Sequence, residues 1–133
     1  MTGEKQFETR VKNWLISQGV YPSGTPSHKM VINNGWFLKI WGGGYQKSGI
    51  PDLLMCVKGM FIAVEIKSST GKPSELQQLN IDRINTAGGI GLILYPDDFE
   101  TFKKQIQEVI SCNFHTAGLK RLNNVNSSSN SDT

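Results

Sequence analysis

Two acidic residues and one lysine in the middle of the sequence can do chemistry together if the chain folds as its pattern predicts. Asp52 and Glu65 lie in two apolar, strand-prone runs that are joined at residues 58–59. A turn centred there pairs positions whose numbers sum to 117, so Asp52 faces Glu65, and Lys67 projects from the same face. Directly opposed side chains have Cβ atoms only ~4.5–5.5 Å apart, and like charges at that spacing are destabilising. The two carboxylates therefore need a compensating charge.

The remaining residues of these runs, 50–57 and 60–66, are apolar on both faces, which is typical of a sheet covered on both sides. We therefore expect the three charged residues at one end of a largely buried hairpin. Two carboxylates in such a site either bind a cation or take up a proton. One or two carboxylates, completed by water and phosphate oxygens, are the ligands that Mg²⁺ prefers. With Lys67 orienting or deprotonating the attacking water, the pattern predicts metal-assisted hydrolysis of a phosphodiester. The alternative is a pair of exposed strand ends with a salt bridge.

Three amphipathic helices are predicted around this hairpin from apolar residues at helical spacing and from helix start and stop signals. A capping-box pattern, Ser74-Glu75-Leu76-Gln77, opens the second helix. The predicted helices run from Glu4 to Gln18, from Ser74 to Gly88-Gly89, and from a cap at Asp97 through Ile110.

The other segments predict a loop and further strands. Residues 20–28 contain two prolines and indicate a loop, whereas residues 30–32 and 36–41 flank Asn33-Asn34-Gly35, a strong hairpin signal. Residues 90–95 indicate a short buried strand. The expected order is α-β-β-β-α-β-α, an α/β fold with a mixed central sheet flanked by helices.

Length and composition predict one globular domain with a polar tail. The chain has 133 residues, of which 38% are hydrophobic and 19% charged, and no run approaches the ~20 apolar residues of a membrane span. We expect a domain over residues 1–121 and a disordered, Asn/Ser-rich tail over residues 122–133. Two cysteines and a charged start favour a reduced, cytoplasmic protein without membrane association.

Positive charge is concentrated in the first third of the chain, which is compatible with a phosphate-bearing partner. Residues 1–49 carry six Lys and Arg against two Glu, a net charge of +4, whereas the whole chain has a net charge of +3. The same clustering also occurs on ordinary solvated surfaces.

The motifs together resemble the PD-(D/E)XK nuclease superfamily, and within it the small stand-alone VRR-NUC proteins, which are often phage-encoded. The resemblance covers residues 4–106 and rests on Gly49-Ile50-Pro51-Asp52, Glu65-Ile66-Lys67 and Ser74 to Gln77. It implies a restriction-endonuclease-like αβββαβ core and a Mg²⁺- or Mn²⁺-dependent DNA endonuclease. It further implies a homodimer that acts on branched DNA of the Holliday-junction or flap type, in the cytoplasm of a bacterial or phage-infected cell.

Carried over to this sequence, the resemblance makes Asp52 and Glu65 metal ligands and Lys67 the lysine that positions water or stabilises the transition state. Glu8 would be a third acid and metal ligand, although Glu4 flanks the same apolar stripe and either can be a solvated helix-edge charge. Gln77 would support the active site, or serve only in the capping box.

The resemblance implies that Lys39 contacts the scissile phosphate or the neighbouring backbone, although a lysine on an exposed strand face is also ordinary. Lys47 and Gly44, in a glycine-rich loop, are further candidate DNA contacts, because lysine neutralises phosphate and glycine allows close approach of the backbone. Trp36 and Trp41 are expected mostly in the core, with stacking on DNA as the alternative.

A zinc site is not expected, and two further functions stay open. His28 and His115 are isolated, and Cys56 and Cys112 fit small core residues. The alternative functions are a non-catalytic DNA-binding module on a nuclease fold and a sequence-specific, restriction-type endonuclease.

Overall fold

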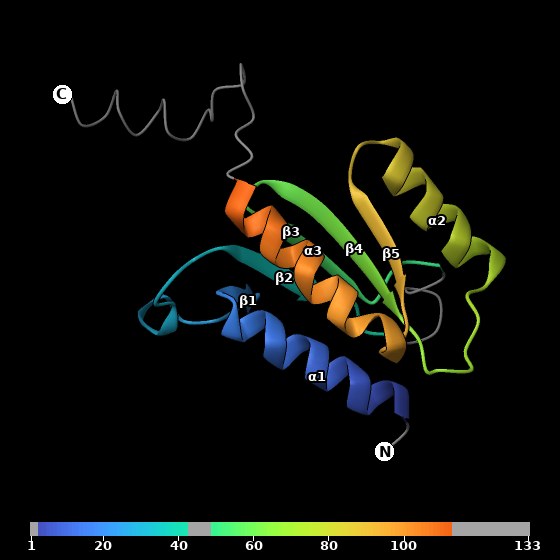
Figure 1. The fold of residues 1–133 in the computed structure, drawn as a ribbon, viewed down its shortest axis with the longest axis horizontal. Helices are drawn as coiled ribbons and strands as arrows, with labels where there is room; N and C mark the ends of the chain where they lie inside the picture. The colour runs from blue at the N-terminus through green and yellow to red at the C-terminus, as the bar shows by residue number, and fades with distance from the viewer. Residues whose placement is uncertain (1–2, 43–48, 113–133) are drawn as a thin grey trace.

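The protein is an α/β fold built on one five-stranded mixed sheet in the order β1-β2-β3-β4-β5 (Figure 1). The computed structural model describes residues 3–42 and 49–112. The end strands β1 and β5 run parallel to their neighbours, and β2, β3 and β4 are antiparallel. The elements are α1 (Gly3–Ser17), β1 (Val20–Pro22), η1 (Ser27–Lys29), β2 (Gly35–Lys39), β3 (Leu53–Val57), β4 (Met60–Ile66), α2 (Glu75–Thr86), β5 (Ile90–Leu94), η2 (Pro96–Asp98) and α3 (Phe99–Cys112).

The central hairpin of β3 and β4 has the predicted register. Leu53 pairs with Val64, and each later pair also sums to 117. Lys58 and Gly59 form the turn with positive φ angles of 49° and 88°. A two-residue turn with both φ angles positive matches the right-handed twist of the strands, so it fixes this register.

The predicted hairpin at Asn33-Asn34-Gly35 is wrong. No strand forms at residues 30–32, where Val31 is 89% exposed, and the strand beside β2 is instead β1, which the sequence indicated as part of a loop. Asn34 explains the difference: its backbone N–H donates to Gly19 O at 2.8 Å and its Nδ2 to Gln18 O at 2.7 Å. These two bonds hold the loop against the end of α1. A hairpin turn at residues 33–35 would leave them unmade.

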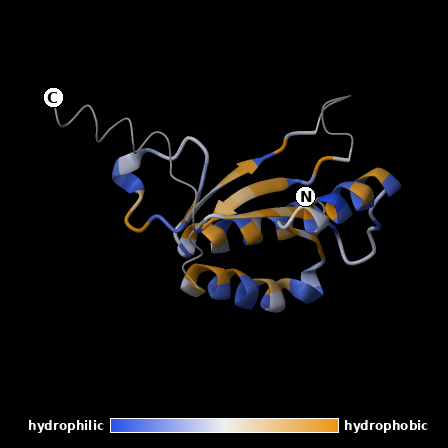
Figure 2. Ribbon diagram, turned by 90° about the horizontal axis from the view of Figure 1, so that it is seen from above, coloured by the Kyte–Doolittle hydropathy of each residue, from blue (hydrophilic) through white to orange (hydrophobic). Residues whose placement is uncertain are grey.

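One face of the sheet carries the main hydrophobic core. Apolar side chains of α1 and α3 pack there against inward-facing side chains of β2, β3 and β4. Figure 2 shows the strands mostly in the hydrophobic colour, and helices that carry hydrophobic residues on one side and hydrophilic residues on the other. The most deeply buried side chains of this core include Val11, Leu15, Phe37, Leu53, Ile62, Val64, Phe102 and Ile106.

The opposite face is covered only in part, which corrects the expectation of a hairpin buried on both sides. Among the described elements, α2 packs over β5 and β4 on this face, and side chains over β2 and β3 stay exposed. Trp36 is 47% exposed and Phe61 44%, and Cys56 is exposed. Trp41, beyond the end of β2, is 76% exposed. The expectation of core positions for these residues is therefore wrong.

The helix boundaries follow the predicted signals closely. Ser74 caps α2 in a complete capping box with Gln77. Asp97 differs from its predicted role, because it lies within the short helix η2, which leads directly into α3. Cys112, also predicted as a core residue, is exposed at the end of α3. Within the described ranges, no helix is long and apolar enough to cross a membrane.

Candidate active site

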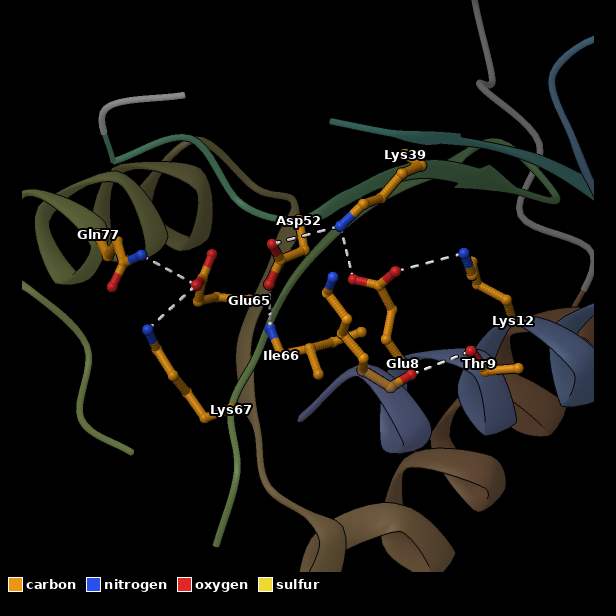
Figure 3. A network of polar contacts seen from close by, with 10 residues as sticks. Glu8, Thr9, Lys12, Lys39, Asp52, Glu65, Ile66, Lys67 and Gln77 are labelled. Atoms are coloured by element: carbon orange, nitrogen blue, oxygen red, sulfur yellow. Dashed lines mark hydrogen bonds and ion pairs between the residues drawn. The ribbon is translucent and has the colours of Figure 1, made fainter. Parts of the chain in front are cut away.

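Asp52 and Glu65 lie next to each other at one end of the sheet, as the register predicted (Figure 3). Asp52 directly precedes β3, and its main-chain O accepts a hydrogen bond from Ile40 N at 2.8 Å. Its carboxylate Oδ2 accepts one from Ile66 N at 2.7 Å. The main chain of Asp52 is thereby held by the residue after β2, and its carboxylate by the last residue of β4. Asp52 is only 4% exposed and Glu65 2%, so both carboxylates are buried.

A lysine and a glutamine converge on the Glu65 carboxylate. Lys67 Nζ lies 3.3 Å from Glu65 Oε2, and Gln77 Nε2 donates to the same oxygen at 2.9 Å. Lys67 is positioned by the sheet, because its N–H donates to Leu94 O at 3.0 Å just beyond the end of β4. Gln77 is positioned by the first turn of α2, where its Oε1 accepts from Ser74 N at 2.8 Å. Both predicted roles of Gln77, the cap and the active-site contact, are therefore present as contacts.

A second ion-pair group lies beside Asp52. Lys39, on β2, points to the sheet face that α1 and α3 cover. Its Nζ lies 2.6 Å from Glu8 Oε1 and 3.7 Å from Asp52 Oδ1. Lys12, one turn after Glu8 on α1, lies 3.3 Å from Glu8 Oε2. Glu8 thus reaches the Asp52 carboxylate through the ammonium of Lys39, as Figure 3 shows. Between the two glutamates considered for the third acid, it is Glu8 that contacts the network.

Lys39, which the resemblance implied as a DNA contact, lies within this ion-pair group. Its side chain is 17% exposed and its ammonium is engaged by two carboxylates. The other two predicted DNA contacts, Lys47 and Gly44, lie outside the described residues.

The sequence analysis did not identify some residues that support the site. Asn80, on α2, donates from its Nδ2 to Gly49 O at 2.7 Å and so fastens the segment that leads into Asp52. Asn80 stands among other polar residues of α2, and nothing in its spacing singles it out. Lys12 is four residues after Glu8, so the ion-pair spacing of helices was a usable signal for that contact.

The donor set suits a hard divalent cation that keeps several water ligands. Two buried carboxylates, Asp52 and Glu65, provide oxygen ligands of the kind Mg²⁺ takes. Among the residues that the structure describes, no three His, Cys, Asp or Glu side chains come together as a ready-made metal site. Glu8 is consistent with this, because Lys39 lies between it and Asp52. The residues present therefore fit a Mg²⁺ ion held by two carboxylates, and do not fit a closed structural site such as that of zinc.

Among the residues that the structure describes, ion pairs join the carboxylates of Glu8, Asp52 and Glu65 to the ammonium groups of Lys12, Lys39 and Lys67. The formal charges of these six groups cancel. Addition of a divalent cation makes the network positive, which favours an anionic group such as a phosphate. The arrangement can thus hold a cation and a phosphate side by side, with Lys67 next to both.

Comparison of this chain with protein-family models, with curated proteins and with solved structures found no match.

Proposed function

We propose that this protein is a Mg²⁺- or Mn²⁺-dependent DNA endonuclease that hydrolyses phosphodiester bonds. In this proposal it belongs to the VRR-NUC branch of the PD-(D/E)XK superfamily and has a restriction-endonuclease-like core. The observation that carries the proposal is the buried pair Asp52 and Glu65, with Lys67 Nζ 3.3 Å from the Glu65 carboxylate. Two buried carboxylates beside a lysine at one end of the sheet are unfavourable as a purely structural feature and useful for phosphoryl chemistry.

Each residue has a distinct part in this proposal. Asp52 and Glu65 would hold the metal ion, which polarises the phosphodiester and lowers the pKa of a bound water. Lys67 orients the attacking water and stabilises the negative charge that develops on the phosphate. Gln77 holds the Glu65 carboxylate in place, so that its second oxygen keeps a fixed direction.

The substrate is proposed to be branched DNA, cut by a homodimer in the cytoplasm of a bacterial or phage-infected cell. The selectivity for branches and the dimer rest on the family resemblance of the motifs. The charge distribution supports a nucleic-acid substrate in general, since residues 1–49 carry a net charge of +4 and the rest of the chain −1.

The test is cleavage of a labelled four-way junction, a 5′ flap and a linear duplex in Mg²⁺, Mn²⁺ or EDTA. We expect metal-dependent cutting by the wild-type chain, and Asp52→Asn to lower its rate by at least about 100-fold. The matched control is Glu100→Gln, because Glu100 is also paired with a lysine but its side chain is 81% exposed on α3. This control should cut at the wild-type rate.

Two results would contradict the proposal. Cutting that persists in Asp52→Asn or in EDTA would show that the activity does not use this site. Binding of DNA without cutting in any metal would favour the non-catalytic DNA-binding module, and the proposed chemistry would then be wrong.

A further inference from the structure

A pocket of about 490 Å³ opens at the edge of the sheet beside the candidate active site. It exists because β1 ends at Pro22 while β2 continues to Lys39, so the edge of β2 has no strand beside it over its last residues. α1 passes along the other side of this gap. The residues that line the pocket are Thr9, Lys12, Asn13, Ile16, Pro22, Ser23, Phe37, Leu38, Lys39 and Trp41.

The lining combines three kinds of group. Pro22, Phe37 and Leu38 provide an apolar wall, and Thr9, Asn13 and Ser23 provide hydrogen-bonding side chains. Lys12 and Lys39 provide positive charge, and both also contact Glu8 of the candidate active site (Figure 3). The volume lies within the ~300–1,000 Å³ of small-molecule sites, which are likewise apolar with a few polar groups.

Trp41 is the most unusual member of this lining. It is 76% exposed, although a tryptophan gains more than almost any other side chain from burial. The ammonium of Lys39 lies 5.7 Å from the centre of the Trp41 ring, close enough for a cation–π contact that fixes the ring near the pocket. An aromatic ring held at the rim of a polar pocket that two lysines line is an arrangement on which nucleobases stack.

We propose that this pocket binds one unpaired nucleotide of the DNA substrate, with its base stacked on Trp41. Asn13, Thr9 and Ser23 are placed to contact the edge of the base, and Lys12 is placed to contact its phosphate. Lys39 belongs both to the pocket and to the network at Asp52. Lys39 alone therefore separates a nucleotide in the pocket from the Asp52 carboxylate.

This inference rests on the proposed function and makes it more specific. A base inside a duplex, or in a fully paired four-way junction, is stacked on its neighbours and must unpair to enter a side pocket, whereas a base in a flap or a single-stranded arm can enter without unpairing. The pocket would thus select DNA with an unpaired nucleotide next to the scissile phosphate. It gives a preference for flap-type branched DNA, rather than for a fully paired four-way junction, a physical cause in this chain.

The experiment measures binding in EDTA, so that it does not depend on cleavage. Fluorescence anisotropy is recorded with a labelled splayed-arm DNA and with a fully paired duplex, for the wild-type chain and for Trp41→Ala. We expect Trp41→Ala to weaken binding of the splayed-arm DNA about tenfold or more and to change binding of the duplex less than twofold. Trp41→Phe should restore most of the loss, because phenylalanine also stacks.

Two controls separate stacking from other effects. Trp36→Ala removes a second exposed tryptophan on the sheet face away from Lys39, and it should leave both affinities within twofold of the wild type. Abasic nucleotides in the unpaired arms should weaken binding by the wild-type chain as much as Trp41→Ala does. The two changes together should cost no more than either alone, as expected for two partners in one contact.

Equal losses on splayed-arm and paired DNA would overturn the proposal, because Trp41 would then contact DNA without selecting unpaired bases. Full binding of the abasic substrate by the wild-type chain would overturn it as well. The two proposals fail separately. Cutting that depends on Asp52 but not on Trp41 keeps the nuclease and removes the pocket, and Trp41-dependent binding without cutting does the reverse.

Discussion

Two side chains of different chemical character contact the carboxylate of Glu65. Gln77 Nε2 is a neutral donor at 2.9 Å, and Lys67 Nζ is a cation at 3.3 Å from the same oxygen. Removal of the neutral donor changes the orientation of Glu65, whereas removal of the cation changes both the charge of the site and the group available to a water or phosphate. The two neighbours can therefore be told apart by substitution.

Lys67→Met tests the part of the lysine. Methionine has a similar length, and the Lys67 side chain is only 15% exposed, so the fold should be kept. We expect DNA cleavage to fall by about 100-fold, the scale of a lost acid–base group. Binding of Mn²⁺, followed by electron paramagnetic resonance, should be unchanged or tighter, because a positive charge next to Glu65 has been removed.

The control for this change is Lys103→Met, since Lys103 also pairs with a glutamate, at 3.2 Å on α3. It should leave both cleavage and Mn²⁺ binding at wild-type levels. Loss of Mn²⁺ binding in Lys67→Met would show instead that the lysine holds the site together.

Among the elements, the start of α2 connects stability to the site. Ser74 Oγ accepts a hydrogen bond from Gln77 N at 3.1 Å, and Gln77 Oε1 accepts one from Ser74 N at 2.8 Å. The Nε2 of the same glutamine donates to Glu65 Oε2. A capping box stabilises a helix end without any catalytic function. In this protein the same glutamine also contacts a buried carboxylate, so the position of α2 determines the geometry of the site.

Substitution of the two box residues separates these parts. Ser74→Ala and Gln77→Ala should each lower the free energy of unfolding in urea by about 1 kcal/mol. Only Gln77→Ala should also slow DNA cleavage, by about tenfold, because it alone removes the contact with Glu65. Equal cleavage rates in the two variants would show that the contact between Gln77 and Glu65 does not contribute to activity.

The segment before β3 is held in place by close packing at Gly49. Its φ angle is +75°, and an added Cβ would lie 2.3 Å from Leu76 Cγ on α2. We expect Gly49→Ala to lower the free energy of unfolding by at least about 2 kcal/mol, from left-handed backbone strain and the clash together. Cleavage should fall as well, because this segment leads directly into Asp52.

Gly24→Ala is the matched control for strain alone. Gly24 has a φ of +87°, but an added Cβ would meet no atom within 4 Å. It should cost about 1 kcal/mol in the same urea experiment. Equal losses in the two variants would contradict the packing of Leu76 against Gly49.

For the whole molecule, the main asymmetry is that one sheet face is covered by α1 and α3 and the other only partly by α2. Cys56 lies on the open part of the second face and is exposed, and Cys112 is exposed at the end of α3. These are the two cysteines of the chain. Their reactivity therefore reports on the open face and on a reference point at the end of α3.

We expect both thiols to react with a thiol reagent in the folded protein at low concentration, without denaturant. Cys56→Ala and Cys112→Ala each remove one reactive group and identify the two rates. If the open face becomes covered by a second copy at higher protein concentration, Cys56 should slow while Cys112 keeps its rate. A native protein in which Cys56 does not react at any concentration would contradict the open face.

The sequence by itself determined the parts of this protein that depend on local signals. The two-residue turn at 58–59 sets the register that places Asp52 opposite Glu65, and the capping box sets the start of α2. The apolar periodicity sets α1 and α3. Each of these follows from backbone geometry or from contacts within a few residues, so no knowledge of distant contacts is needed.

Tertiary structure alone decided the rest, because it depends on which distant groups compete for the same partners. Asn34 bonds to the end of α1 and so excludes the hairpin that its local sequence favours. The small footprint of α2 leaves Trp36, Cys56 and Phe61 exposed on a face that the apolar pattern indicated as covered. Lys39 forms ion pairs with the acids of the site because β2 places it between Glu8 and Asp52. Glu8 lies 31 positions before Lys39 in the chain and Asp52 lies 13 positions after it.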